Sequence, residues 1–257
     1  MASVSSHAPG RFCWVELGTT DQRAAKAFYG GLFGWEPHDQ PIGPGEVYTL
    51  LRQAGRDAAA AYTLRPEQRG VPPHWQLYVA VESADAAVAR ARELGATVLA
   101  PPFDVFDSGR TAVLQDPTGA VFAVWEARRH AGLGVVDEAG AFCWAELLTR
   151  ETSKAAAFYQ ALFGWGTGGD ARYVEWTHGD QSIGGMMEIR KEWGEVPPHW
   201  LVYFQVENTD LSAAKARSLG ATVTMGPEEI AGVGRFAVLR DPQGAAFYVF
   251  QLTGQGH

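Results

Sequence analysis

The sequence predicts an α+β fold of four βαβββ modules, arranged as two tandem domains. The first observation is an internal repeat, in which residues 12–35 match residues 142–165 at an offset of 130, with 14 of 24 positions identical. A second block, residues 71–127, matches residues 196–252 at an offset of 125. The second observation is that strand-like and helix-like patterns alternate within each copy. Together these patterns indicate duplicated domains in which helices pack on sheets.

The repeat defines the domain boundaries. We expect a first domain over residues 8–127 and a second over residues 141–254. Residues 128–140 (RRHAGLGVVDEAG) lie between the copies, and their glycine-rich, charged composition is typical of a linker. Because fused copies take the place of two subunits, we expect a monomer with internal pseudo-twofold symmetry.

The first half of each copy predicts one strand, one helix and further short strands. In the first copy, residues 12–17 predict the opening strand, and residues 48–51 and 58–64 predict the later ones. Thr20 or Asp21 caps an alanine-rich helix between them, and the helix closes near Gly34. We expect its buried face to consist of Ala24, Ala27, Phe28 and Leu32.

The second half of each copy repeats this order. Residues 74–81 predict a strand, and a helix follows from about Ser83 to Leu94, with Gly95 as its stop signal. Strands near residues 110–115 and 120–125 complete the domain, separated by a DPTG turn.

Composition restricts the partners. The formal net charge of −8 leaves no basic stripe for phosphates, so we expect neither nucleic acid nor an anionic membrane as a partner. A small aromatic or amphipathic molecule is the expected partner. The first ten residues carry no basic or apolar targeting region, and no apolar run reaches the roughly 20 residues needed to cross a bilayer, which predicts a cytoplasmic protein. Cys13 and Cys143 occupy equivalent repeat positions and are interpreted as small buried residues.

Three motifs present in both copies carry a family resemblance. These are FYxxLFGW at residues 28–35 and 158–165, LGATV at 94–98 and 219–223, and DPxG at 116–119 and 241–244. With the module order, they resemble the vicinal-oxygen-chelate superfamily, which contains glyoxalase I, extradiol dioxygenases and bleomycin-resistance proteins. WxEL and PPHW resemble more narrowly the two-domain, glyoxalase-like actinobacterial type. The resemblance covers about 230 residues and implies tandem glyoxalase-like domains.

The resemblance also implies a divalent metal, held by histidine, glutamine or glutamate on inward-facing strand positions. Those positions hold Trp14, Thr63, Gln76 and Ala123 in the first copy, and Trp144, Glu188, Leu201 and Tyr248 in the second. Neither domain keeps three ligands, so we expect no metal and no other cofactor. His74 and His199 share the inward parity, but we interpret PPHW as an edge turn in which the histidine caps or packs.

The same parity predicts two aromatic concave faces, or cups. The first is expected to contain Trp14, Glu16, Gln76, Tyr78 and Trp125, and the second Trp144, Glu146, Tyr203, Gln205, Tyr248 and Phe250. Aromatic walls with a few polar groups favour binding of a flat organic ligand, with Trp14 and Trp144 as stacking walls. The alternative is that these rings only fill the cups.

Glu16 and Glu146 need partners if they face inward. Arg110 and Arg235, each in a repeated GR dipeptide, are the expected ionic partners and potential ligand contacts. The alternative is that Glu16 or Glu146 acts as a general base.

The leading hypothesis is a metal-independent small-molecule-binding protein of bleomycin-resistance type, serving as an accessory or resistance factor for planar aromatic metabolites. One alternative is a glyoxalase-like or dioxygenase-like enzyme, a lyase, isomerase or oxygenase using a metal or Glu16 or Glu146. Another is an interaction scaffold with filled cups.

Overall fold

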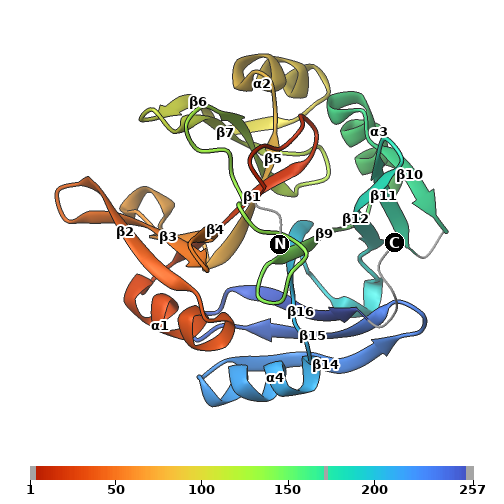
Figure 1. Cartoon of the computed structure of the whole chain (residues 1–257). Helices are drawn as coiled ribbons and strands as arrows, with labels where there is room; N and C mark the ends of the chain where they lie inside the picture. The colour runs from red at the N-terminus through yellow and green to blue at the C-terminus, as the bar shows by residue number, and fades with distance from the viewer. Residues whose placement is uncertain (1–3, 171–172, 253–257) are drawn as a thin grey trace.

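A computed structural model describes residues 4–170 and 173–252, which form two eight-stranded sheets and four α-helices (Figure 1). The first sheet has the strand order β2-β3-β4-β1-β5-β8-β7-β6, and the second β10-β11-β12-β9-β13-β16-β15-β14. The two orders are equivalent, so each sheet is one copy of the repeat. The four expected βαβββ modules and the two tandem domains are confirmed.

The elements of the first domain fall into two modules. They are β1 (Phe12–Thr19), α1 (Gln22–Phe33), β2 (Glu36–Gly43), β3 (Glu46–Gln53), β4 (Arg56–Thr63), then β5 (His74–Ala80), α2 (Ala84–Glu93), β6 (Thr97–Val105), β7 (Gly109–Gln115) and β8 (Val121–Ala127). A short 3-10 helix, Pro66–Gln68, joins the modules. At the centre of the sheet β1 is antiparallel to β5, while β1 is parallel to β4 and β5 is parallel to β8.

The second domain repeats this arrangement. Its elements are β9 (Phe142–Thr149), α3 (Thr152–Phe163), β10 (Gly166–Gly169), β11 (Val174–His178), β12 (Gln181–Glu188), β13 (His199–Gln205), α4 (Thr209–Ser218), β14 (Thr222–Ile230), β15 (Gly234–Arg240) and β16 (Ala246–Leu252), with a 3-10 helix at Lys191–Trp193. No helix among the described residues is both long and apolar enough to cross a membrane.

Two strands of the first domain have no counterpart among those placed from sequence. They are β2 and β6, and both lie at the outer edges of the sheet. β2 contains Pro37 and Pro41, and β6 contains Pro101 and Pro102. Proline cannot donate to a ladder and is tolerated at a sheet edge, where one side needs no partner. These strands therefore lack the alternating apolar pattern that marked the inner strands.

The first helix shows which sequence signals held. The Asp21 side chain accepts a hydrogen bond from the amide of Ala24, and Gly34 ends the helix in the left-handed region at φ 76°. The buried face is Ala25, Phe28, Tyr29 and Leu32, so the expected inclusion of Ala24 and Ala27 is wrong. Alanine packs on either face of a helix, whereas the larger side chains decide its orientation.

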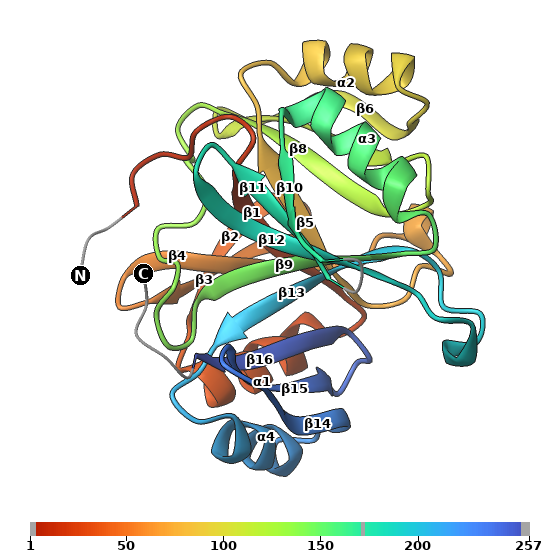
Figure 2. The same ribbon diagram turned by 90° about the vertical axis from the view of Figure 1, so that its right-hand side faces the viewer.

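The helices lie in two pairs at opposite ends of the molecule, where α1 contacts α4 and α2 contacts α3, while strands β5 and β13 of the two sheets contact each other between them (Figures 1 and 2). Tyr29 of α1 donates a hydrogen bond to Asp241 Oδ2 of the other domain at 3.0 Å, and Tyr159 of α3 donates to Asp116 Oδ2 at 2.8 Å. Both aspartates belong to the DPxG turns. Two of the repeated motifs therefore meet at the domain interface.

The other oxygen of each aspartate organises its own turn. Asp116 Oδ1 accepts from the amides of residues 118, 119 and 120, and Asp241 Oδ1 accepts from those of residues 243, 244 and 245. The indoles of Trp75 and Trp200 donate in turn to Tyr29 and Tyr159. Each interface tyrosine is thus fixed by one domain and bonded to the other.

We predict that Tyr29→Phe destabilises the protein by about 1–3 kcal/mol, because buried Asp241 loses a donor that water cannot replace. Urea unfolding measures the change. Tyr62→Phe is the control, since its partly buried hydroxyl accepts from Gln68 within the first domain and makes no bond to the second domain among the described residues. Equal losses in the two variants would contradict a special role for the interface bond.

Candidate functional site

Each sheet has one side covered by helices and one side turned away from them. We call the second side of the first sheet the first face, and that of the second sheet the second face. Glu16 lies opposite Gln76 in the β1–β5 pair, and Trp14 lies opposite Tyr78, which places these side chains on one side of the sheet. Each face is built within a single domain, because both of its modules are adjacent in sequence.

A hydrogen-bonded cluster occupies the first face. Tyr48 donates to Glu16 Oε2 at 2.8 Å, and Tyr78 donates to Glu16 Oε1. The Trp14 indole donates to the Tyr48 hydroxyl at 3.0 Å. The carboxylate expected on the inner face is therefore present, and two tyrosines satisfy its two oxygens.

Burial sets the electrostatics of this cluster. It raises the pKa of Glu16, while the hydrogen bonds from Tyr78 and Tyr48 act in the opposite direction. Burial and the nearby Glu16 charge hold the pKa values of Tyr48 and Tyr78 well above the usual range. The tyrosines therefore stay protonated as donors, and the pKa of Glu16 lies above its usual value.

The second face repeats the cluster. Glu146 accepts hydrogen bonds from Tyr203 and Tyr173, and the Trp144 indole donates to the Tyr173 hydroxyl at 2.9 Å. Glu146 is only 5% exposed, and burial raises its pKa to about 7. Tyr48 and Tyr173 were not among the residues expected from sequence, although they are related by the same offset of 125 as the second repeat block.

The raised pKa of Glu146 predicts a specific pH dependence of the free energy of unfolding. Because the folded pKa of Glu146 is about 7 against 4.5 for an ordinary glutamate, the folded state binds the proton more tightly, and stability is lost as pH rises through this window. Between pH 5 and pH 8 this effect lowers the free energy of unfolding by up to about 3 kcal/mol, and we expect Glu146→Gln to abolish that decrease. Urea unfolding at both pH values is the measurement. Glu188→Gln, at the exposed end of β12, serves as the control. An unchanged pH slope in Glu146→Gln would contradict the assignment.

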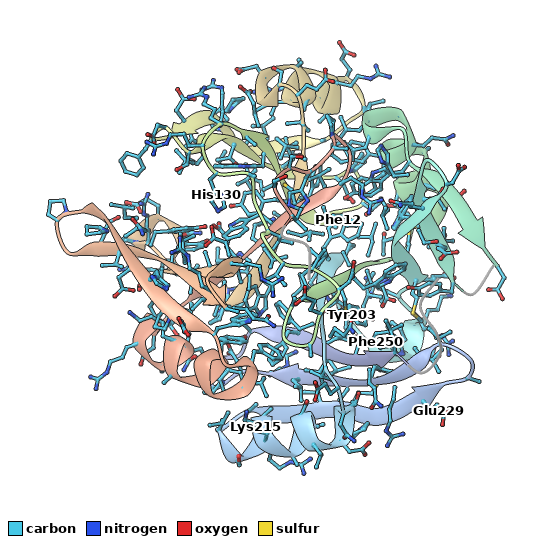
Figure 3. All side chains as sticks on the ribbon, viewed as in Figure 1. Phe12, His130, Tyr203, Lys215, Glu229 and Phe250 are labelled. Atoms are coloured by element: carbon cyan, nitrogen blue, oxygen red, sulfur yellow. The ribbon has the colours of Figure 1, made fainter. Side chains whose placement is uncertain are left out.

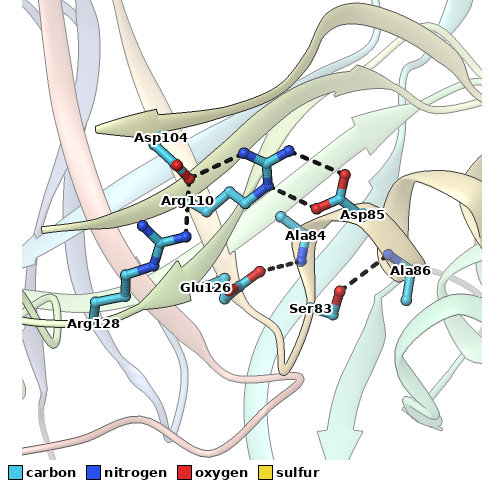
Figure 4. A network of polar contacts seen from close by, with 8 residues as sticks. All are labelled: Ser83, Ala84, Asp85, Ala86, Asp104, Arg110, Glu126 and Arg128. Carbon is cyan, nitrogen blue, oxygen red and sulfur yellow. Dashed lines mark hydrogen bonds and ion pairs between the residues drawn. The ribbon is translucent and has the colours of Figure 1, made fainter. Parts of the chain in front are cut away.

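The expected ion pairs between these glutamates and the GR arginines are wrong. Arg110 binds Asp85 of α2 at 2.7 and 3.1 Å and Asp104 of β6 at 3.0 Å (Figure 4). Arg235 binds Asp210 of α4 at 2.7 and 2.9 Å. Both arginines lie on the helix side of their sheets, because strand alternation places Thr111 and Phe236, not the arginines, on the faces.

Figure 4 also shows the polar network that surrounds Arg110 on the helix side of the first sheet. Glu126, opposite Arg110 in the β7–β8 pair, accepts from the amide of Ala84 at the start of α2. Arg128 shares Asp104 with Arg110. This network attaches the helix to the sheet and has no contact with Glu16.

The residues at the family's metal positions do not fit a divalent metal. Indole and alanine offer no ligand at Trp14 and Ala123, and the amide nitrogen of Gln76 is bonded to the carbonyl of Leu77. In the second domain Leu201 is apolar and Glu188 is exposed. The described residues contain no group of three or more histidine, cysteine, aspartate or glutamate side chains that could hold a metal ion.

The two PPHW histidines are the first residues of the inner strands β5 and β13, so the expected edge turn is wrong. Nδ1 of His74 bonds to the carbonyl of Pro72 at 2.9 Å, and Nδ1 of His199 bonds to that of Pro197 at 2.7 Å. Each ring is bonded to the backbone just before its strand, which agrees with the expected capping or packing role.

His130 of the linker is a site residue that the sequence did not indicate. Its ring meets Trp14 edge-on at 4.6 Å between centroids, and its Nε2 lies 3.4 Å from Asp57 Oδ2. The indole of Trp125 donates to the His130 carbonyl at 2.9 Å. Figure 3 labels this histidine beside the first sheet. The linker therefore covers one end of the first face, and Trp14 and Trp125 are 4% and 7% exposed.

On the second face the expected aromatic residues do gather. Tyr203 and Tyr248 lie 4.3 Å apart between ring centroids, and Phe250 lies 6.2 Å from Tyr203 (Figure 3). Gln205 is partly buried at the end of β13, and its Oε1 has no hydrogen-bond partner among the described residues. A cavity of about 440 Å³ adjoins Trp144 and Cys143, with residues 4–12 and 136–137 on its other side.

Comparisons with known proteins agree with this architecture. Residues 11–124 match the Glyoxalase/Bleomycin resistance protein/Dioxygenase superfamily, and residues 143–250 match a glyoxalase-like domain family. The protein named "Putative glyoxylase CFP32" of Mycobacterium tuberculosis (strain CDC 1551 / Oshkosh) is 42% identical over 264 residues, covering 99% of this chain and 100% of that protein. Anthracycline biosynthesis protein DnrV of Streptomyces peucetius is 36% identical over 266 residues, covering 97% and 96%.

Solved structures share the fold at low sequence identity. The Mn(II)-bound glyoxalase of Novosphingobium aromaticivorans has a TM-score of 0.67 and 16% identity, covering 95% of this chain and 82% of that chain. An extradiol ring-cleaving dioxygenase of B. fuscum has a TM-score of 0.68 and 14% identity, covering 99% and 74%. The family match, the full-length relatives and the repeated modules agree: this chain belongs to the glyoxalase/bleomycin resistance protein/dioxygenase superfamily, with one glyoxalase-like domain in each half.

Proposed function

We propose that this protein binds a planar aromatic small molecule on the faces turned away from its helices, without a divalent metal held by the chain. The observation that carries the proposal is that a tryptophan stands where the family places its first metal ligand, next to a glutamate that is hydrogen-bonded to tyrosines. Trp14 and Trp144 occupy the first ligand position, and Glu16 and Glu146 are bonded to tyrosines. Aromatic walls with a few polar groups suit flat organic ligands.

Two relatives support the ligand class. DnrV, and DauV of Streptomyces sp. (strain C5) at 34% identity over 265 residues, are named as anthracycline biosynthesis proteins. Anthracyclines are planar polycyclic compounds. An accessory or resistance factor that handles such molecules in the cytoplasm would need a binding face of this kind.

A second candidate is acid–base catalysis by Glu16 or Glu146. The observation in its favour is the raised pKa of both carboxyls, to about 7 for Glu146, since a general base works best with a pKa near the operating pH. The tyrosines would hold the carboxylate in place while it takes a proton from the carbon beside the carbonyl of a bound ketone and returns it to another atom of the same molecule, which is an isomerisation. Such a reaction needs no redox partner, and Glu146→Gln would abolish it while leaving ligand binding within a few-fold.

Binding of a planar probe tests the main proposal. We expect dihydroxyanthraquinone to quench the tryptophan fluorescence of the purified chain with a dissociation constant in the micromolar range, roughly −8 kcal/mol. A short polar compound such as glutathione is the control ligand and should leave the fluorescence unchanged. If no planar compound quenches the fluorescence, the aromatic side chains only fill the two faces, and the scaffold hypothesis replaces the binding hypothesis.

Metal content tests the metal-independent part. Elemental analysis after dialysis should show no stoichiometric divalent metal, because neither face offers three suitable ligands. About one zinc, nickel, manganese or iron per domain would overturn this part, and would favour an enzyme of the glyoxalase or dioxygenase type.

We further propose that the protein is a monomer, since the helix faces that could pair two chains already pair within one. Light scattering should give the mass of a single chain. The isolated first half, residues 1–131, should self-associate through Phe28, Tyr29 and Trp35. A stable monomeric half would contradict the fused-dimer origin of the interface.

A further inference from the structure

The two faces share one framework but differ in which residues cover them. Strand pairing establishes the equivalent positions: Ala123 lies beside Tyr78 in the first sheet, and Tyr248 lies beside Tyr203 in the second. Thr111 opposite Trp125 corresponds in the same way to Phe236 opposite Phe250. The second face thus carries two aromatic rings where the first has a methyl group and a threonine.

These rings form a partly exposed platform. Phe236 and Tyr248 are stacked with an interplanar angle of 16° and a centroid distance of 6.1 Å, and Tyr248 is 4.3 Å from Tyr203. Side chains of five aromatic residues on this face are intermediate in exposure, namely Trp144, Tyr173, Phe236, Tyr248 and Phe250. Grouped rings that stay half open to solvent are a surface on which another flat ring can stack.

The platform rests on a buried base. Leu148, Ile189, Leu201 and Tyr203 form a hydrophobic cluster of their own, against which Trp144, Tyr248 and Phe250 pack. Glu146 lies among these side chains and is 5% exposed. The rings are therefore held in place before any ligand arrives, which lowers the entropic cost of binding.

The first face is closed at the corresponding place. Its rings Trp14, Tyr78 and Trp125 are each 7% exposed or less, and Ala123 is fully buried. His130 of the linker packs against Trp14 and bonds to Trp125 through its carbonyl. A flat ligand would have to displace the linker to reach these rings.

One polar group on the platform is available to a ligand. The hydroxyl of Tyr248 makes no hydrogen bond with the residues that the structure describes, whereas those of Tyr173 and Tyr203 are bonded to Glu146. Burial holds the pKa of Tyr248 above its usual range, so the hydroxyl remains a donor. A carbonyl or hydroxyl oxygen on the edge of an aromatic ring is its natural partner.

We infer that the second face alone is the ligand site, and that it takes a planar aromatic molecule bearing ring oxygens, of the quinone or hydroxyquinone class, through stacking on Phe236 and Tyr248 and a hydrogen bond to the Tyr248 hydroxyl. This inference rests on the proposed function and selects one of its two faces.

The test is a titration of the full chain with dihydroxyanthraquinone. We expect one molecule bound per chain. Phe236→Thr/Tyr248→Ala introduces the residues that the first domain itself carries at these positions, and it should weaken binding about tenfold or more through the loss of two stacked rings. Tyr248→Phe keeps the stack and loses the hydroxyl, and should weaken binding a few-fold.

The matched control is Leu50→Ala/Val113→Ala, which trims two half-buried side chains of the first sheet. It should leave the dissociation constant within about twofold, and circular dichroism should confirm that all variants fold. Two molecules bound per chain would overturn the inference. It would also be overturned if the control weakened binding while the Phe236→Thr/Tyr248→Ala variant bound as tightly as the unmodified chain. Absence of binding by the unmodified chain would instead defeat the proposed function itself.

Discussion

The pair of tyrosine–aspartate hydrogen bonds across the domain boundary is the constraint on which the remaining geometry depends. Each aspartate uses one oxygen to shape its own DPxG turn and the other to accept from a tyrosine of the opposite domain. Because Tyr29 and Tyr159 are equivalent, the two bonds are related by the pseudo-twofold axis. They join the helix-covered sides of the two sheets, so that both faces point outward, while the helices lie in two pairs at opposite ends of the molecule.

Once the faces point outward, sheet register determines their chemistry. Pairing of β1 with β5 places Glu16 next to Gln76, and pairing of β9 with β13 places Glu146 next to Leu201. A carboxylate at such a position is costly unless it is bonded, and tyrosines from other parts of the same domain supply the bonds without adding charge. The same tyrosines keep their protons, and burial raises the pKa of both glutamates, to about 7 for Glu146. This is a different solution from a metal site, which would need several charged or imidazole ligands at the same positions.

Duplication gave both domains the same framework, but the linker and two substitutions within the repeat made the faces unequal. The linker follows β8 directly and returns across the first sheet, where Leu133 bonds to the carbonyl of Cys13 and His130 covers Trp14. On the second face, Phe236 and Tyr248 take the places of Thr111 and Ala123 and remain partly open. Small changes on a rigid framework can therefore separate a covered face from an open one, because close-packed interiors do not adjust gradually.

The sequence by itself determined the duplication, the module order, the helix caps at Asp21 and Gly34 and the inward direction of Glu16 and Glu146, since these follow from local periodicity and strand alternation. It missed the edge strands β2 and β6, whose prolines hide the strand pattern. Only the tertiary structure decided the partners of the glutamates. Arg110 and Arg235 lie on the opposite side of their sheets, whereas Tyr48 of β3 and Tyr173, which directly precedes β11, reach the glutamates from about 30 residues away in the chain. It also decided that His130 covers Trp14, because contacts made by a linker leave no periodic signal in the sequence and depend on where the folded chain returns.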